Sequence, residues 1–268
     1  MTIKGYDAGK LAAEALLVGE ADISTTADVA FVGKSFDNPD IRILGAIDQG
    51  FLHEIVARKD KGITNPADLA GKKIGITKGT TGEFFLRIFL TFNGLSLKDV
   101  EVVGLEPSEI VDAINKGEID AGSTWNPFVH QIKQNFGDEV VRWESQCGQP
   151  MYFILLTKEK WLNENKETAE RFIRSLIQAE EFIKQNNIEA RDIITQELGF
   201  ESSYHNAIWK NYELSITFPQ ALLIAMEDQA RWRINNRLTD ATEIPNYLDY
   251  IYLDALEEVN RSQNAQGS

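Results

Sequence analysis

A loop rich in hydroxyls and glycine is the first segment whose residue types suit ligand binding. Gly79-Thr80-Thr81-Gly82 follows an expected strand at residues 73–77 and precedes an expected helix that starts at Glu83. At the carboxyl end of a strand, such a loop presents hydroxyls and backbone N–H groups that could hold a sulfonate, nitrate or carboxylate without a metal. Lys78 adds positive charge, which Glu83 partly opposes. The alternative is a helix cap in which Thr80 or Thr81 bonds its own backbone.

A second hydroxyl-rich segment occupies the equivalent place after an expected strand at residues 21–26. It reads Ser24-Thr25-Thr26-Ala27-Asp28. Thr25 and Thr26 are therefore candidates for binding a small polar ligand. Asp28 disfavours a nearby anion and suits an amine, or it caps the following turn.

Trp125 and Asn126 follow a third expected strand and form a further candidate pair. The indole would supply a flat apolar wall, and the amide would supply both a donor and an acceptor. The alternative is that Trp125 belongs to the core.

The residues that usually perform catalysis are scattered. His53, His130 and His205 lie far apart, and they form neither a His-x-x-x-His nor a His-Glu-x-x-His spacing. The chain has no Gly-x-Ser-x-Gly elbow, and its glycine loop is not a phosphate loop. Cys147 has no base close to it in the sequence, and a lone cysteine excludes an intrachain disulfide. We therefore expect a protein that is not an enzyme, with no metal and no cofactor.

Strand and helix patterns alternate in the first half of the chain, and helices dominate the second half. Strands are expected at residues 2–6, 21–26, 41–47, 51–58, 73–77, 100–105, 120–125 and 152–157. Helices are expected at residues 10–18, 83–93, 108–116, 167–185, 189–198, 202–211, 219–235 and 247–259, with a short one opened by Pro66. This alternation predicts an α/β fold with a largely parallel sheet.

One internal repeat links the two halves of this pattern. Ala15-Leu16-x-x-Gly19-Glu20-x-Asp22-x-x-x-Thr26 recurs as Ala113-Ile114-x-x-Gly117-Glu118-x-Asp120-x-x-x-Thr124. Each copy reads as a helix, a glycine turn and a strand, so the repeat favours two similar lobes. Asp22 and Asp120 are interpreted as structural turn residues.

The composition narrows the class of partner. Of 268 residues, 27 are basic and 41 are acidic, which gives a net charge of −14. Because phosphate binding needs clustered Lys and Arg, this charge argues against a nucleic-acid partner. No apolar run approaches the roughly 20 residues of a membrane span, and the residues after Met1 lack the apolar region of a signal peptide.

The motifs, taken in order, resemble a known family. Residues 68–76 (DLAGKKIGI) and 78–86 (KGTTGEFFL) are followed by Gly117-Glu118-Ile119-Asp120-Ala121 and by Trp125-Asn126-Pro127-Phe128. This order resembles ABC-transporter substrate-binding proteins of the nitrate, sulfonate and taurine type, the thiamine-pyrimidine-precursor-like (SsuA/THI5-like) family. The resemblance covers nearly all of residues 5–259.

The resemblance implies a two-lobe, type II periplasmic-binding-protein fold with mostly parallel sheets and a helical C-terminal part. Lobe I would take residues 1–51 and 150–268, and lobe II would take residues 52–149. It also places Gln49, His53, Gln149 and Tyr152 near the expected lobe crossovers, where residues often face ligand. The candidate ligand-binding residues are thus Thr25, Thr26, Asp28, Gln49, His53, Gly79, Thr80, Thr81, Trp125, Asn126 and Gln149.

The family's function implies capture of a small sulfonate-like or nitrate-like anion, or a pyrimidine-like compound, between two hinged lobes for ABC-type import. The implied partner is a membrane permease, and the implied location is periplasmic or extracellular and membrane-associated. Two alternatives stay open: the ligand-sensing input domain of a membrane signalling receptor, and a pyrimidine-synthase-like enzyme.

The chain departs from the family at its start. Family members begin with a strand, a ligand-contacting loop and a helix upstream of the point where Met1 lies. We expect the absence of that strand to leave backbone groups of two neighbouring strands unpaired, at about 1–3 kcal/mol for each buried group.

Overall fold

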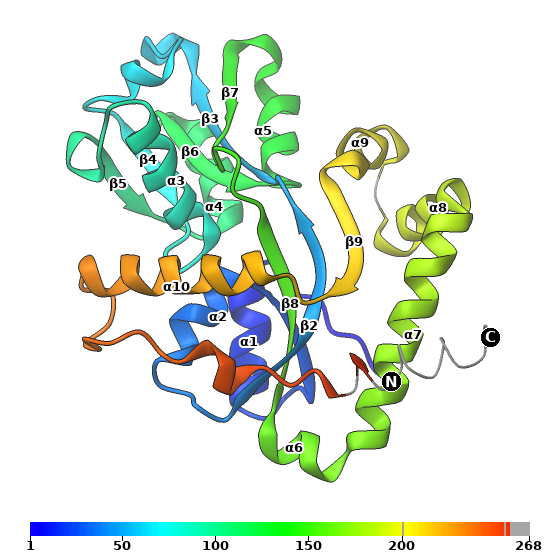
Figure 1. Cartoon of the computed structure of the whole chain (residues 1–268). Coiled ribbons are helices and arrows are strands. Elements are labelled where there is room, and N and C mark those ends of the chain that lie inside the picture. The colour runs from blue at the N-terminus through cyan, green and yellow to red at the C-terminus, as the bar shows by residue number, and fades with distance from the viewer. Residues whose placement is uncertain (200, 255, 258–268) are drawn as a thin grey trace. The chain divides into compact units, whose positions relative to one another are not determined.

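The computed structural model describes residues 1–199, 201–254 and 256–257 (Figure 1). The chain forms two compact units. Unit 1 combines Met1–Gly50 with Tyr152–Ser268, and unit 2 is the continuous segment Phe51–Met151. Each unit contains its own sheet and its own buried core.

Unit 2 is built on a five-stranded sheet with the order β5-β4-β6-β3-β7. Its elements are β3 (His53–Arg58), β4 (Lys73–Ile76), α3 (Thr81–Phe92), β5 (Glu101–Gly104), α4 (Pro107–Lys116), β6 (Ala121–Trp125), α5 (Phe128–Phe136) and β7 (Val140–Glu144). Strand β4 is parallel to β5 and β6, whereas β3 is antiparallel to β6 and β7.

Two buried clusters cover the two faces of the unit 2 sheet. Ile55 packs in the cluster that contains Leu86 of α3, whereas its neighbour Val56 packs with Ile110 of α4 and Ile132 of α5. Successive side chains of a strand point to opposite faces. Helix α3 therefore covers one face, and α4 and α5 cover the other.

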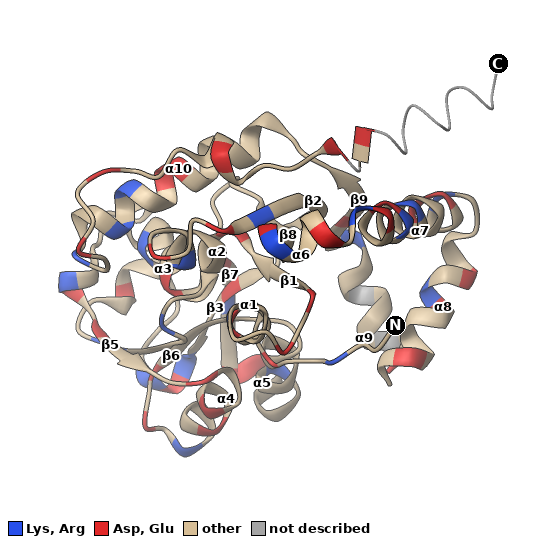
Figure 2. Ribbon diagram, turned by 90° about the horizontal axis from the view of Figure 1, so that it is seen from below, with Lys and Arg blue, Asp and Glu red and all other residues tan. Residues whose placement is uncertain are grey.

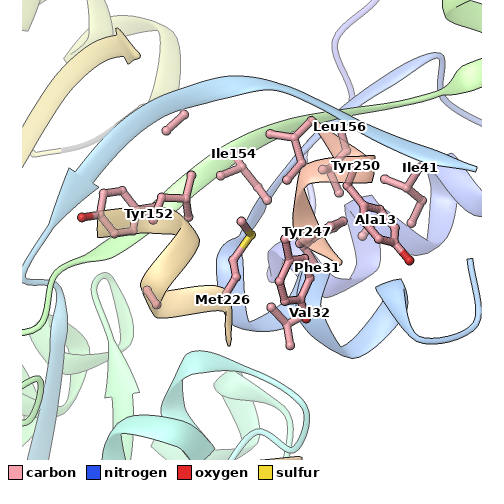
Figure 3. Close-up of a cluster of buried hydrophobic side chains, with 14 of the residues drawn as sticks. Ala13, Phe31, Val32, Ile41, Tyr152, Ile154, Leu156, Met226, Tyr247 and Tyr250 are labelled. Carbon is pink, nitrogen blue, oxygen red and sulfur yellow. The ribbon is translucent and has the colours of Figure 1, made fainter. Parts of the chain in front are cut away.

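Unit 1 has a four-stranded sheet with the order β1-β8-β2-β9. Its elements are α1 (Gly9–Leu17), β1 (Ile23–Ala27), α2 (Asp28–Ser35), β2 (Ile41–Gly50), β8 (Met151–Lys158), α6 (Glu159–Glu164), α7 (Lys166–Gln185), α8 (Asn187–Leu198), α9 (Ser202–Ile208), β9 (Tyr212–Thr217) and α10 (Gln220–Asn235). Figure 3 shows its main core, in which Phe31 lies against Tyr247 and Tyr250 with ring centroids 6.0 and 5.6 Å apart.

The internal repeat corresponds to the same local structure in both units. Helix α1 is followed by Gly19 at φ +80° and then β1, and α4 is followed by Gly117 at φ +73° and then β6. The backbone N–H of Glu20 bonds the carbonyl of Ala15 at 2.8 Å, and that of Glu118 bonds Ala113 at 2.9 Å. Both glycines thus end a helix in the left-handed conformation that favours glycine.

Several expectations about individual elements are wrong. Residues 2–6 form no strand. The expected helix at 247–259 begins instead as a short 3₁₀ turn, Tyr247–Tyr250, followed by extended chain at Ile251, whose parallel bridge joins it to Ile43, and residues 254, 256 and 257 are helical. The later part of that range includes residues 255, 258 and 259, which lie outside the described residues. The sheets are mixed, since the parallel pairing between named strands lies in β5-β4-β6 and the pairs β1–β8 and β2–β9 are antiparallel.

Strand β8 lies between β1 and β2 and is hydrogen-bonded to both, although it comes from a segment more than a hundred residues away. Strand β1 is an outer strand of this sheet, and the strand pairing described for it is the one with β8. The expectation of unpaired backbone groups at the start of the chain stays a prediction.

Charges are distributed over the helices rather than gathered by sign. Figure 2 shows basic and acidic residues alternating along α7, where Lys184 and Glu180 form an ion pair. Among the described residues, no helix has both the length and the apolar character that crossing a membrane requires.

Candidate functional site

The N-terminus of α3 in unit 2 is formed by the predicted glycine and threonine loop. Thr80 is the N-cap residue, and its Oγ1 accepts a hydrogen bond from the Gly82 amide at 3.2 Å. The same hydroxyl donates to the Thr77 carbonyl at 2.6 Å. The capping interpretation is therefore confirmed for Thr80, and the hydroxyl is held firmly in the loop.

Thr81 has a different partner, because its hydroxyl meets a buried histidine. Thr81 Oγ1 lies 2.5 Å from His53 Nε2, and His53 is only 1 % exposed. The imidazole also packs against the rings of Phe85 and Trp125, at centroid distances of 5.4 and 5.3 Å. The antiparallel register of β3 and β6 sets His53 directly opposite Trp125.

Burial keeps His53 uncharged. Desolvation lowers the pKa of His53 to about 3, so the ring is neutral at neutral pH. A neutral imidazole has one donor nitrogen and one acceptor nitrogen. The His53–Thr81 pair can therefore offer a hydrogen-bond donor to an anion without itself carrying charge.

A close approach of α3 to β6 depends on Gly82. A Cβ added at Gly82 would lie 3.0 Å from the Ser123 carbonyl oxygen and 3.6 Å from the Trp125 ring. The Ser123 hydroxyl in turn donates to the Gly82 carbonyl at 2.8 Å. Glycine at this position thus brings the first turn of α3 against the end of β6.

Several polar side-chain atoms of unit 2 are buried without a hydrogen-bond partner among the described residues, and three of them lie near this site. These three are His53 Nδ1, Thr77 Oγ1 and Thr124 Oγ1. Thr77 directly follows β4, and Thr124 is the penultimate residue of β6. An unpaired buried polar group costs about 1–3 kcal/mol, so these atoms favour a partner such as water or a ligand.

Gln146 is a structural residue of this region that sequence reasoning missed. Its side-chain oxygen accepts bonds from the backbone amides of Leu52 and His53 at 2.5 and 3.0 Å. Its amide nitrogen donates to the carbonyl of Gln149 at 2.9 Å. No local sequence signal distinguishes this glutamine, because its partners lie on both ends of unit 2.

The two charged residues beside the loop, Glu83 and Lys78, have separate contacts. Glu83 accepts a hydrogen bond from the Gly79 amide at 2.8 Å, so its carboxylate braces the loop. Lys78 is exposed, and its side chain lies over Gly104, where an added Cβ would approach Lys78 Cε to 2.8 Å.

The candidates in unit 1 have separate surroundings. Thr25 is exposed, whereas Thr26 is buried against Gly9, where an added Cβ would lie 2.9 Å from the Thr26 hydroxyl. Asp28 is the first residue of α2, and its carboxylate accepts bonds from the Val29 amide at 2.8 Å and from Gln229 at 2.9 Å. Burial raises the pKa of Asp28 to about 6.

The structure brings some candidates together and separates others. In unit 2, His53, Thr81 and Trp125 are in direct contact, and Gly79 and Thr80 belong to the same loop. Asn126 is half-buried after β6, and Gln149 is held through its backbone. In unit 1, Gln49 donates to Glu213 at 2.5 Å.

The remaining catalytic-type residues are not assembled. Cys147 Sγ has the Ser145 carbonyl as its hydrogen-bond acceptor, at 3.7 Å, and burial and the nearby Glu144 raise the pKa of its thiol. His205 bonds Thr195 at 2.5 Å. Among the described residues, no group of three His, Cys, Asp or Glu side chains is placed to hold a metal ion.

Comparison with known proteins assigns the family. The model of the NMT1/THI5-like family matches residues 1–190. The chain belongs to the NMT1/THI5-like family. Both the predicted family and the predicted periplasmic-binding-protein fold class are thereby confirmed, the fold by the solved structures described below.

Several named proteins are similar in sequence to part or most of this NMT1/THI5-like chain. A Brucella abortus protein provisionally named as a binding protein is 33% identical over 147 residues, which are 54% of this chain and 46% of that protein. The chain thus spans about half the length of that relative. A Bacillus subtilis protein provisionally named as an aliphatic sulfonates-binding protein is 25% identical over 258 residues, 94% of this chain and 77% of that protein. The Escherichia coli taurine-binding periplasmic protein is 26% identical over 180 residues, 66% of this chain and 55% of that protein.

Solved structures share the fold. The alkanesulfonate-binding protein SsuA from Xanthomonas axonopodis pv. citri, bound to MOPS, has a TM-score of 0.79 at 18% identity, covering 92% of this chain and 86% of that one. The periplasmic aliphatic sulphonate binding protein SsuA from Escherichia coli has a TM-score of 0.77 at 18% identity, covering 92% and 85%. The desulfurization enzyme DSZB has a TM-score of 0.66 at 13% identity, covering 91% and 86%. The fold therefore occurs in both binding proteins and an enzyme.

Proposed function

We propose that this NMT1/THI5-like chain is a solute-binding protein that captures a small sulfonate or similar anion for import. The observation that carries the proposal is the N-terminus of α3, which Thr80 caps and where the Thr81 hydroxyl meets the neutral, buried His53. The proposal names this place in unit 2 as the anion-binding site.

This site suits a sulfonate because it presents hydrogen-bond donors that point toward one place. A helix N-terminus carries about half a positive charge and several N–H groups without an intrahelical acceptor. The Thr81 hydroxyl and the neutral imidazole of His53 together add a donor, and they leave no buried charge behind when the anion leaves the site. Such a site suits reversible capture, since it holds an anion without a metal or a buried cation.

The relatives support the ligand class. Two proteins similar to most or two thirds of this chain carry names that specify aliphatic sulfonates and taurine. We extend that chemistry to this chain as a proposal, together with an ABC permease as its membrane partner and a periplasmic or extracellular location.

Capture is favoured over catalysis by the state of the lone cysteine. A nucleophilic cysteine needs a lowered pKa, whereas burial and Glu144 raise the pKa of Cys147. Its nearest described polar partners are the Ser145 carbonyl and the Glu144 carboxylate at its backbone amide. Neither of these groups is a base placed to remove the thiol proton.

The test is binding of ethanesulfonate by wild type and by two variants of Thr81. Thr81→Val removes the hydroxyl and keeps the side-chain shape, whereas Thr81→Ser keeps the hydroxyl and is the matched control. A lost hydrogen bond to an anion costs about 1.5–3 kcal/mol, so calorimetry should show an affinity reduced by tenfold or more for Thr81→Val. Thr81→Ser should remain within a few-fold of wild type.

A thermal-shift screen extends the test to other anions. At 100 times its dissociation constant, a ligand stabilises the folded protein by about 2.7 kcal/mol. Sulfonates, nitrate, bicarbonate and pyrimidines are compared at equal ionic strength. A protein that melts cooperatively and responds to none of them contradicts the proposal.

A further inference from the structure

The side chain of Gln146 links the segment where the chain enters unit 2 to the segment where it leaves. Gln146 is fully buried. Its Oε1 accepts hydrogen bonds from the Leu52 and His53 amides at 2.5 and 3.0 Å. Its Nε2 donates to the Gln149 carbonyl at 2.9 Å. One side-chain amide therefore connects segments that lie 94 positions apart in the sequence.

Gln146 replaces a main-chain partner at the end of the β3–β7 ladder. The register pairs Glu54 with Glu144, so the next pair along the two strands is His53 with Ser145. In an antiparallel hydrogen-bonded pair, each residue donates its N–H to the carbonyl of the other. The Ser145 amide does donate to the His53 carbonyl at 3.0 Å, but the His53 amide donates to Gln146 Oε1. Both polar groups of the His53 backbone are therefore held by this short segment after β7.

The turn that carries Gln146 is itself braced. The Glu144 carboxylate accepts hydrogen bonds from the amides of Gln146 and Cys147, the latter at 3.2 Å. Cys147 has a left-handed backbone conformation with φ +52°, which is uncommon for a residue other than glycine. The Gln149 amide donates to the Gln146 carbonyl at 3.0 Å. Bonds on both sides of Gln146 thus fix the direction in which its side chain leaves the backbone.

The His53 backbone matters because its side chain belongs to the candidate anion site. His53 Nε2 lies 2.5 Å from Thr81 Oγ1, and the ring packs against Phe85 and Trp125. A hydrogen bond weakens steeply when its atoms move apart or out of line. A shift of the His53 backbone would therefore weaken the contact between the imidazole and Thr81.

We propose that Gln146 is a positioning residue for the anion site, because it holds the His53 backbone and so keeps the imidazole against Thr81. This inference rests on the proposed function of the α3 site. Gln146 acts through His53 rather than on the anion itself. A side-chain amide suits this task, since it combines an acceptor for backbone N–H groups with a donor for a carbonyl and adds no negative charge near an anion.

The first test observes His53 in the ligand-free protein, so it does not depend on the proposed function. In a neutral imidazole, the hydrogen bond at one nitrogen decides which nitrogen carries the proton. Nitrogen NMR of isotope-labelled histidine should show separate signals for the two His53 nitrogens, assigned by their loss in His53→Gln. Gln146→Met keeps the side-chain length and removes the hydrogen-bonding atoms. It should move the two signals toward each other, because the imidazole then exchanges between tautomers.

Gln146→Glu is the conservative variant in this experiment. It keeps an oxygen atom that can accept from the Leu52 and His53 amides, so it should restore the separate His53 signals. Ile132→Val is the matched control for lost stability, because it removes a methyl group from the buried cluster beside α5. It should lower the stability of unit 2 and leave the His53 signals as in wild type.

The second test measures ethanesulfonate binding by calorimetry. Gln146→Met should lower the affinity about tenfold, as expected for the loss of one hydrogen bond to an anion. Ile132→Val should bind like wild type. Circular dichroism verifies that each variant is folded.

Another variant covers the case in which Gln146→Met does not fold. Glu144 is exposed, so Glu144→Ala should fold, and it releases the amides of Gln146 and Cys147 from their acceptor. It should move the same His53 signals and weaken ethanesulfonate binding several-fold.

The outcomes separate this inference from the proposed function. His53 signals that match wild type in folded Gln146→Met, or in Glu144→Ala if the first variant does not fold, overturn the positioning role. Changed signals with an unchanged affinity overturn it as well. Changed signals in a protein whose wild type does not bind ethanesulfonate support the hold of Gln146 on His53 and refute the proposed function.

Discussion

At the scale of single residues, burial decides the chemistry of the ionisable groups more than their neighbours do. Desolvation is the largest cause of the pKa shifts of His53, Asp28 and Asp48. His53 is kept neutral within an aromatic surround, and Asp48 favours its protonated form. Both residues make stability depend on pH, in opposite directions.

His53 should destabilise the fold as the pH falls. Its pKa is 6.5 in the unfolded chain and about 3 when folded, so between these values only the unfolded state binds the proton. The contribution is present above pH 6.5 and is lost at about 1.4 kcal/mol per pH unit below it. Urea unfolding of wild type and His53→Gln between pH 4.5 and 7.5 should show a smaller slope for the variant. His130→Gln, at a half-buried histidine, serves as the control, and equal slopes for wild type and His53→Gln would refute the expectation.

Asp48 should have the opposite effect. Its pKa is raised from 3.8 to about 7, so between these values the folded state binds a proton that the unfolded state has lost. The free energy of unfolding contributed by Asp48 therefore falls as the pH rises from about 4 to 7. Asp48→Asn should gain stability relative to wild type across this window, with Asp37→Asn showing no such trend. A difference that stays constant with pH would show that Asp48 does not titrate there.

At the scale of elements, the repeated helix, glycine and strand are the most local part of the fold. Gly19 and Gly117 both adopt positive φ, and the residue after each closes the same backbone hydrogen bond to its helix. An added Cβ at Gly19 would meet no atom within 4 Å, whereas at Gly117 it would meet the flexible end of Arg58 at 3.4 Å. Backbone conformation, and not space, therefore requires glycine at both positions.

Substitution of either glycine should cost similar stability. Gly19→Ala and Gly117→Ala should each lower the free energy of unfolding by about 1–2 kcal/mol, the cost of a left-handed conformation for an L-residue. Gly5→Ala is the control, because Gly5 has open space and no positive φ. Chemical denaturation measures all three, and a loss no larger than that of Gly5→Ala would contradict this account.

At the scale of the whole molecule, the two units differ in how the chain builds them. Unit 2 is continuous and contains a complete five-stranded sheet with a buried cluster on each face. Unit 1 needs two segments, because β8 from the second segment lies between β1 and β2 of the first. We therefore expect a fragment that contains only unit 2 to keep its sheet and core, and a fragment that contains only the first segment of unit 1 to lose them.

The segment Phe51–Met151 should fold alone. Its core and sheet lie within the segment, and its length is that of an ordinary domain. We expect a cooperative urea transition by circular dichroism that coincides with the transition followed by Trp125 and Trp143 fluorescence. Met1–Gly50 expressed alone should not show one, because it lacks β8. A non-cooperative transition for the longer segment would refute the independence of unit 2.

Two kinds of feature could be predicted from the sequence alone: local backbone structures, and the family, which was identified from the order of the motifs. The glycine ends of α1 and α4 and the cap at Thr80 follow from residue types within a few positions. The order of the motifs identified the family and, through it, the fold class.

Only the tertiary structure decided the strand order, the antiparallel pairings of β9 and β7, and the environment of the site. His53 is buried because Phe85 and Trp125, which belong to other elements, pack against it. The backbone amide that Gln146 binds at Leu52 lies more than ninety residues away in the chain. Burial and pairing depend on contacts between distant segments, and no local pattern of residue types encodes which segments will meet.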